Sequence, residues 1–364
     1  MNYTAEEKIC ILFGDLGLAA NKFYQLLNLY GDAARLSREF CTDAAAEKVV
    51  GDAYSTLCHA LKTNQVEKVL SQMGKYGVTA VTCFSATFPQ SLANIPDPPY
   101  VLFCRGNVGL LSTRCLGVVG TRKVSAYGKR VATDFSAVLS EKFTVVSGLA
   151  YGVDAIAHES TLKQNGKTIA VLGGGLVHVY PSANQDLAER IVQSGGLLVS
   201  EYGMFADPRP YRFPHRNRLV SGLSLGLLVC QAPPKSGTAG TVECALEQGR
   251  DVFAVPGEIY DFGFQGNNSL IKSMQGVCVT NPREILEFYH LDEPEKRVNE
   301  RCYQLNMDEQ MVVEALSEGQ LTFDKLVEKT KISPSDLNFL LANLEIKSII
   351  ARLPGNLYRS LWRN

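Results

Sequence analysis

Apolar positions follow a helical spacing at the start of the chain. From Leu16 to Leu36 they recur every three to four residues, with glycines between the runs, and this spacing predicts amphipathic helices. We therefore expect residues 1–75 to form a small helical domain of the SAM or helix-hairpin-helix kind. The Gly14–Gly17 turn contains an acid, Asp15, which favours a structural or protein-contact role over binding to a nucleic-acid backbone.

Between residues 76 and 290 the pattern changes to short apolar runs rich in Val, Leu and Cys. The runs are 78–84, 100–104, 115–120, 143–148, 168–175, 197–201, 225–232, 251–257 and 277–280, and helical patterns fall at 126–142, 151–166, 184–195 and 238–249. Strands without polar alternation are buried on both faces, as in a parallel sheet covered by helices. The repetition predicts a doubly wound α/β domain, whose ligands bind at the carboxyl ends of the strands.

The pattern returns to helical spacing after a charged stretch. Residues 291–304 are charged and weakly apolar, which predicts a linker. Residues 305–364 contain three helical patterns, two of them with N-cap residue types at Thr322 and Ser333, followed by a hairpin pattern around Pro354–Asn356. Three helices and a hairpin form a winged helix. Duplex binding and protein contact both stay open for this unit, whose basic residues are Lys325, Lys329, Lys331, Lys347, Arg352, Arg359 and Arg363.

Composition narrows the class of protein. The chain has 364 residues, of which 46% are hydrophobic and 20% charged, as expected of two or three well-packed domains. No apolar run approaches the roughly 20 residues of a membrane helix, and no secretory signal is visible at the N-terminus. The ten cysteines form no CxxC pair and the five histidines are not clustered. We expect buried thiols in a reducing cytoplasm, and no metal or cofactor.

A net charge of −1 excludes a uniformly basic nucleic-acid binder, but two local basic islands remain. Gly120–Arg130 contains Arg122, Lys123, Lys129 and Arg130 and no acid, and Phe205–Arg218 contains four arginines and one aspartate. Ser125 has the residue type of a helix N-cap. Basic side chains at a helix start oppose the helix dipole unless an anion binds there, so the first island favours phosphate binding.

Glycine-rich turns follow several of the predicted strands, where backbone N–H groups can approach an anion closely. They lie at Gly120–Arg122, Ser147–Gly148, Gly173–Gly175 and Lys235–Gly237. The GxGxxG and GxxxxGK[ST] patterns are absent from the sequence, which argues against a dinucleotide or nucleoside triphosphate in the usual pocket.

The sequence offers little for catalysis, and we expect a protein that is not an enzyme. It contains no GxSxG, HExxH or zinc-deaminase signature. Asp154 and His158, at i and i+4, are compatible with a metal site or an acid–base pair, but a structural hydrogen bond is favoured because no third ligand is evident. Glu201 and Asp154 could also form a carboxylate pair, although the sequence does not fix their separation.

Seven sequence blocks between Val118 and Ile271 occur in a specific order. They read VVGTR, SGLAYGVDAIAH, VLGGGLVHVYPSAN, SEYG, FPHRNRLVSGLS, KSGTAGTVECALEQGRDVFAVPG and NNSLI. In these blocks the chain resembles the bacterial DNA-processing protein A family (DprA, also called Smf), and its three-part layout is similar too. The resemblance implies a Rossmann-like domain that binds single-stranded DNA, protects incoming strands in natural transformation and loads the RecA recombinase onto strands coated with single-strand-binding protein. It also implies a homodimer formed through residues 266–279.

The resemblance and the strand-end turns together predict the DNA-binding residues. We expect Arg216 and Arg218 to bind phosphate, Phe213 and Pro214 to anchor the loop that carries them, and Arg212 to be a rim charge. The full predicted set is Gly120, Thr121, Arg122, Lys123, Ser147, Gly148, Gly173, Gly174, Gly175, Ser182, Asn184, Phe213, Arg216, Asn217, Arg218, Lys235, Ser236 and Gly237.

Four positions depart from the family pattern. Thr121 stands where the family has a serine, a mild change that keeps a hydroxyl. Ser182 stands where many relatives have a basic residue, His178 where an aspartate often follows the glycine-rich turn, and Gln231 where an acid is usual. One alternative function stays open, a nucleotide-handling enzyme of the phosphoribohydrolase type. Those enzymes depend on an acid near a G-G-x-G-T-x-x-E turn, and SGTAGTVE comes close to that pattern, with Glu243 in the last place.

Overall fold

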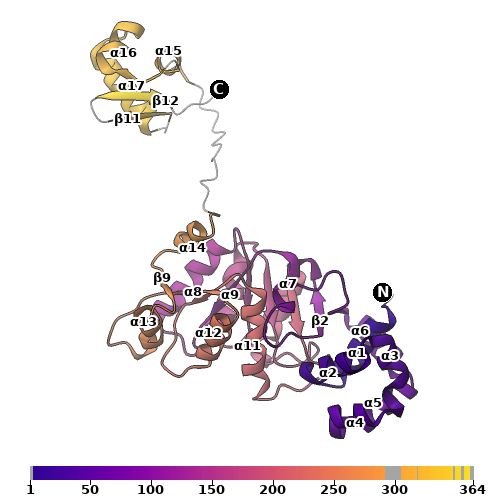
Figure 1. Cartoon of the computed structure of the whole chain (residues 1–364). Helices are drawn as coiled ribbons and strands as arrows, with labels where there is room; N and C mark the ends of the chain where they lie inside the picture. The colour runs from indigo at the N-terminus through magenta and orange to yellow at the C-terminus, as the bar shows by residue number, and fades with distance from the viewer. Residues whose placement is uncertain (1–2, 292–304, 318, 347–348, 354–355, 361–364) are drawn as a thin grey trace. The chain divides into compact units, whose positions relative to one another are not determined.

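The computed structural model describes residues 3–291, 305–317, 319–346, 349–353 and 356–360. The chain divides into two compact units, residues 1–293 and 294–364 (Figure 1). The predicted linker, 291–304, lies outside the described residues except for Leu291.

Six helices open the first unit, as the spacing of the apolar residues predicts. They are α1 (Ala5–Asp15), α2 (Ala20–Tyr30), α3 (Ala33–Glu39), α4 (Ala44–Val50), α5 (Tyr54–Lys62) and α6 (Gln65–Tyr76). Thr4 and Glu7 form a capping box at the start of α1, which satisfies N–H groups that have no partner within the helix. The helices bury Phe13, Phe23 and Phe40 in a core that continues onto Val101 and Phe103 of the sheet.

A nine-stranded sheet forms the centre of the first unit, in the order β1-β2-β6-β5-β4-β3-β7-β8-β9. The strands are β1 (Val78–Thr82), β2 (Val101–Gly106), β3 (Cys115–Val119), β4 (Thr144–Ser147), β5 (Thr168–Val171), β6 (Leu197–Ser200), β7 (Gly226–Val229), β8 (Asp251–Ala254) and β9 (Val277–Cys278). All nine lie within the predicted apolar runs, apart from the last two residues of β2. β2 pairs antiparallel with β1 and β6, and the remaining pairs are parallel.

Helices cover both faces of the sheet, which explains why the strands lack polar alternation. One face packs against α7 (Gln90–Ala93), α11 (Arg212–Leu223) and α12 (Gly237–Glu247). The other face packs against α8 (Ala126–Leu139), α9 (Val153–Lys163) and α14 (Pro282–Phe288). α10 (Gln185–Gln193) joins the core of the N-terminal helices, and α13 (Gln265–Lys272) precedes β9. The mostly parallel, doubly wound fold is therefore confirmed.

The helix α11 corrects one expectation about the basic stretch 212–218. The sequence predicts a loop there, anchored by Phe213 and Pro214, whereas the structure has a helix. Pro214 is the third residue of α11, a position where the missing N–H costs nothing, since the first four N–H groups of a helix have no partner within it.

The second unit is a winged helix, as predicted. Its elements are α15 (Met307–Ala315), β10 (Leu321–Thr322), α16 (Phe323–Thr330), α17 (Pro334–Ile346), β11 (Ile350–Leu353) and β12 (Leu357–Ser360), with strand order β10-β12-β11. Thr322 caps α16 through the N–H of Lys325, and Ser333 accepts from the N–H of Asp336. Pro354 and Gly355, part of the predicted hairpin turn, lie outside the described residues.

Candidate functional site

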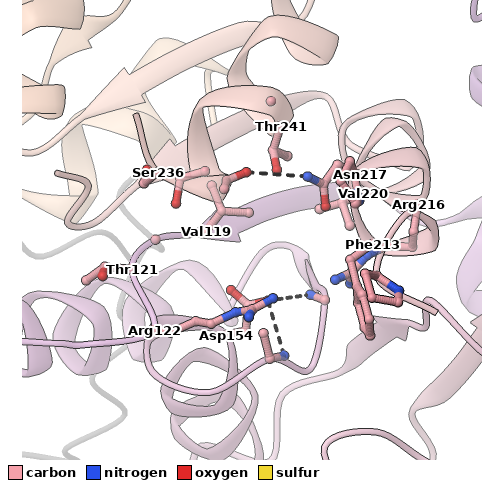
Figure 2. Close-up of a pocket in the computed structure, with 18 of the residues that line it drawn as sticks. Val119, Thr121, Arg122, Asp154, Phe213, Arg216, Asn217, Val220, Ser236 and Thr241 are labelled. Atoms are coloured by element: carbon pink, nitrogen blue, oxygen red, sulfur yellow. Dashed lines mark hydrogen bonds between the residues drawn. The ribbon is translucent and has the colours of Figure 1, made fainter. Parts of the chain in front are cut away.

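A cavity of about 710 Å³ opens at the carboxyl ends of β3, β4 and β7 (Figure 2). The chain runs outward from β3 through β4 and β5 on one side and through β7 and β8 on the other, so the cavity lies at the switch point of the sheet, where α/β proteins bind ligands. It is lined by Val119, Gly120, Thr121, Arg122, Gly148, Ala150, Asp154, Tyr180, Pro210, Phe213, Pro214, Arg216, Asn217, Val220, Ser236, Gly237, Thr238, Gly240 and Thr241.

Two glycines let the turns after β3 and β4 approach each other. A Cβ on Gly120 would lie 2.5 Å from Cγ2 of Val153, and a Cβ on Gly152 would collide with the carbonyl oxygen of Thr121. Gly152 also has a φ of 80°, in the region that favours glycine. Contact between the turns places the Gly120–Arg122 backbone beside the start of α9.

Asp154 stabilises the turn after β4 through hydrogen bonds to its backbone. Its Oδ2 accepts hydrogen bonds from the N–H groups of Gly148, at 3.1 Å, and Ala150, at 3.3 Å. Burial raises the pKa of this carboxyl group, while Arg216 lowers it. His158 instead contacts the hydroxyl of Thr168 at 2.7 Å through Nδ1. Within the described part of the chain, no group of three or more acidic, His or Cys side chains could hold a metal ion.

Arg216 brings a buried positive charge to the cavity wall. The side chain is 4% exposed, and its Nη1 donates to the carbonyl oxygen of Val171. Its Nε is buried without a hydrogen-bond partner. Burial lowers the pKa of the guanidinium, and Asp154 opposes this effect. Because a buried charge is costly without compensation, this side chain favours an anion as ligand.

The start of α12 supplies uncharged hydrogen-bond donors for an anion on the facing wall of the cavity. Ser236 occupies its N-cap, yet makes no capping hydrogen bond, and its hydroxyl is buried without a partner. Thr238 and Thr241 line the cavity from the first turns. Free N–H groups and the helix dipole make such an end a site for phosphate. Arg122 is exposed at the cavity edge, so two guanidinium groups and one helix start converge on the cavity.

Arg218 belongs to a separate cluster that lies outside the cavity lining. Its guanidinium contacts Glu201 at 2.6 Å and Asp97 at 2.8 Å. His215 contacts the same two carboxylates, at 3.1 Å and 3.0 Å. Burial opposes ionisation of Glu201, but His215 and Arg218 keep its pKa below the usual value. The cluster ties α11 to the end of β6 and to the loop after α7, so the structure engages Arg218 with protein carboxylates.

The pH dependence of stability is expected to reveal this cluster. Hydrogen bonds with Asp97 and Glu201 raise the pKa of His215 from 6.5 to about 9. The protonated imidazole stabilises the folded state fully below pH about 6.5, and this contribution is lost as the pH rises through about 9. Urea unfolding of the wild type should therefore show a falling free energy of unfolding over this range. The fall should be smaller in His215→Gln, and an equal fall in the two proteins would contradict the assignment.

The structure brings together half of the predicted site residues. The cavity is lined by Gly120, Thr121, Arg122, Gly148, Phe213, Arg216, Asn217, Ser236 and Gly237. Lys123, Ser182 and Lys235 are exposed but outside the lining. The others hold the turns in place. The hydroxyl of Ser147 donates to Val118, Asn184 donates to the carbonyls of Leu149 and Ala150, and Gly173, Gly174 and Gly175 pack beneath segment 203–213.

Sequence reasoning did not include Thr238, Gly240 and Thr241 in the site. The signal was available, because residues three and four apart share a helix face, and Gly237 and Thr241 are four apart at the start of a predicted helix. Arg212, expected at the rim, lies over the ring of Tyr202 with its Cζ 4.5 Å from the ring centre. It also donates to the carbonyl oxygen of Asp207 at 2.7 Å.

Fold and site together define an α/β protein with a cavity suited to an anion at the switch point of a mostly parallel sheet. Comparison with known proteins then gives the family. The model of the DNA recombination-mediator protein A family matches residues 79–290, and that of the DprA winged helix domain matches residues 303–356. The chain belongs to the DNA recombination-mediator protein A family.

Curated relatives share this region. Protein Smf of Escherichia coli (strain K12) is 45% identical over 205 residues, which are 56% of this chain and 54% of that protein. The chain thus matches about half the length of that relative. DNA processing protein DprA of Bacillus subtilis (strain 168) is 42% identical over 199 residues, which are 54% of this chain and 67% of that protein.

Two solved structures resemble the chain. DNA processing protein A from Streptococcus pneumoniae has a TM-score of 0.65 and 32% identity, covering 79% of this chain and 98% of that one. The same-named protein from Helicobacter pylori, solved for its single-stranded DNA binding mode, has a TM-score of 0.54 and 29% identity, covering 60% of this chain and 97% of that one.

None of the helices in the described ranges combines the length and the apolar character needed to cross a membrane.

Proposed function

We propose that this protein binds single-stranded DNA, with backbone phosphate held in the cavity by Arg122, Arg216 and the start of α12. By this binding it protects incoming strands and helps to load the RecA recombinase in natural transformation and DNA recombination. The observation that carries the proposal is Arg216, a buried guanidinium in the cavity wall with a free Nε. The single-stranded DNA binding mode described for the Helicobacter pylori relative supports the same ligand.

Aromatic side chains beside the phosphate site support a nucleic-acid strand over a free anion. The rings of Tyr180 and Phe213 line the cavity, with centroids 5.5 Å apart. Tyr180 and Tyr211 are exposed. Proteins that bind single strands combine a basic groove with aromatic faces on which bases stack, and this binding tolerates any base sequence.

The remaining predicted residues take two roles in this proposal. Lys123, Ser182 and Lys235 are exposed around the cavity-forming turns and contact the strand where it leaves the phosphate site. Ser147, Asn184, Arg218 and the Gly173–Gly175 turn position the cavity residues without touching DNA. Their exposure and hydrogen bonds support this division.

Fluorescence anisotropy with labelled oligo-dT and with duplex of equal length tests the proposal. We expect tighter binding to the single strand, and affinity that falls with salt at a logarithmic slope of about −0.7 for each phosphate contacted. Exposed lysines alone would bind duplex as well as single strand, because they recognise charge and not unpaired bases. Equal affinity for the two ligands, or affinity independent of salt, would contradict the proposed site.

The alternative of a phosphoribohydrolase has weaker support from the geometry. Glu243, the acid of the SGTAGTVE turn, is exposed on α12 and is not part of the cavity lining. Asp154, the carboxylate in the lining, accepts two backbone N–H groups. We therefore propose a binding protein and not a hydrolase. Release of free base from AMP-type nucleotides that is lost in Arg122→Ala would overturn this choice.

Exposed apolar side chains on the segments next to β8 and β9 support a homodimer. Large apolar side chains are exposed at Ile259, Tyr260, Phe262, Met274 and Val277. Val277 belongs to β9, an edge strand whose two residues are both exposed, and an exposed apolar edge invites pairing with another chain. We propose that this surface, which includes part of residues 266–279, joins two copies. Contacts with RecA and single-strand-binding protein are proposed from family membership.

The winged helix is proposed to contact a protein and not the major groove of duplex DNA. Helix α17, the third helix of the unit, exposes Asp336, Asn338, Phe339, Ala342 and Glu345. This face has two acids and a large apolar ring, and no Lys or Arg among its described exposed residues. Groove-binding helices meet a highly anionic surface, so acids there disfavour DNA. Removal of residues 305–364, with single-strand and duplex affinity then measured separately, tests this assignment.

A further inference from the structure

A second cavity, of about 300 Å³, lies where the N-terminal helices meet the sheet. Its lining comes from α6, the first strands, α10 and the chain after the Gly173–Gly175 turn: Lys75, Tyr76, Val78, Arg105, Leu176, Val177 and Glu189. Glu189 is already paired, because both of its oxygens contact Arg105 at 2.7 Å. Lys75 has no carboxylate partner among the described residues, so the cavity keeps one free positive charge.

An exposed aromatic pair marks the edge of this second cavity. The rings of Tyr76 and Phe205 meet edge to face, with centroids 5.3 Å apart. They remain 37% and 40% exposed, so both rings are accessible to a base. The Nζ of Lys75 lies 5.7 Å from the centre of the Tyr76 ring. Aromatic faces beside a cation are the elements that bind single strands.

Two segments connect the second cavity directly to the first. Val177 lines the second cavity and Tyr180 the first, so their Cα atoms are at most about 11 Å apart. Segment 203–213 runs alongside residues 175–177. The N–H of Val177 donates to Met204 and that of Gly175 to Ala206, and the segment reaches the first cavity at Pro210 and Phe213.

The surface along these segments suits a nucleic-acid strand. His178, Tyr180, Arg209 and Tyr211 are exposed along it, against one exposed acid, Asp207. At about 3.4 Å of rise per nucleotide along one strand, about three nucleotides span the distance from Tyr180 to Val177.

We propose that a single strand held in the first cavity continues across His178 to the second, where a base stacks on Tyr76 and Phe205 and Lys75 neutralises a phosphate. This inference rests on the proposed function and extends it, because it gives the N-terminal helices a direct DNA contact. It predicts that Tyr76 and Phe205 contribute to DNA affinity only when the strand is long enough to reach both cavities.

The test compares two labelled oligo-dT probes, of about 4 and about 15 nucleotides, on the full chain at one salt concentration. The double variant Tyr76→Ala with Phe205→Ala should bind the short probe like the wild type. It should bind the long probe about fivefold or more weakly, since loss of a stacking aromatic typically costs this much. The exchange of Tyr76→Phe with Phe205→Tyr keeps both rings and should restore wild-type affinity for the long probe.

Phe84→Ala is the matched control. Its ring is 44% exposed. It follows the C-terminal end of β1, whereas Val78, which lines the second cavity, is at the N-terminal end. Its loss should leave the affinities for the short and the long probe unchanged. Urea unfolding confirms that each variant is folded. Iodo-deoxyuridine in the long probe should also cross-link to Tyr76 or Phe205 in the wild type.

The outcomes separate this inference from the proposed function. Unchanged affinity of the double variant for the long probe overturns the second contact and leaves the first cavity as the site. Equal weakening with both probes also overturns it, because the pair then acts on the first cavity through packing. If the wild type binds neither probe, the proposed function itself fails.

Discussion

Arg216→Met and Gly148→Ala are each expected to weaken binding of single-stranded DNA by about 10- to 100-fold at constant salt. The first change removes a charged hydrogen-bond donor, and such bonds contribute about 1.5–3 kcal/mol. The second leaves every charge in place. A Cβ on Gly148 would overlap the Arg216 guanidinium, so the side chain must leave its place in the cavity wall.

Both proteins should remain folded. Methionine removes a buried charge that makes no ion pair among the described residues, and a charge of that kind does not stabilise the fold. Anisotropy across a salt series measures the effect, and the slope should shrink by about 0.7 for each phosphate that the variant no longer binds. Arg190→Met, which removes an exposed arginine on α10, is the control and should bind like the wild type. Wild-type affinity in folded Arg216→Met would place the phosphate site elsewhere.

Arg218→Ala is expected to lose stability and not DNA affinity, with a decrease of about 3–5 kcal/mol in the free energy of unfolding. The side chains of Arg218 and Glu201 are each 9% exposed, and removal of one partner leaves the other charge buried and unpaired. Arg122→Ala is the matched comparison. Arg122 is exposed at the cavity edge, so its loss should weaken DNA binding with little change in stability.

Urea unfolding and anisotropy on the same two variants distinguish the roles. We expect folded Arg218→Ala to bind oligo-dT nearly as well as the wild type at low denaturant and low temperature. A stable Arg218→Ala protein that has lost DNA binding would show that Arg218 is a phosphate ligand, as the sequence alone predicts.

Much of the fold could be predicted because the signals are local. Each buried strand is a short apolar run, several of these runs end in Gly or Ser, and strand–helix repetition permits few arrangements other than a doubly wound sheet. The convergence of the turns after β3, β4 and β7 also follows from parallel strands, whose carboxyl ends share one edge. These regularities led to Arg122, Gly148, Ser236 and Gly237 without knowledge of the tertiary structure.

The roles of the arginines in residues 212–218 required the tertiary structure. In a helix each residue turns by about 100°, so Arg216 and Arg218 point to different sides and cannot both face the cavity. His215 and Arg218, three apart, share the side that meets Asp97 and Glu201. Asp97 is 121 residues from Arg218, and no local pattern reports so distant a partner. The sequence by itself predicted an anion site at this edge of the sheet, and the packing of α11 decided which guanidinium lines the cavity there.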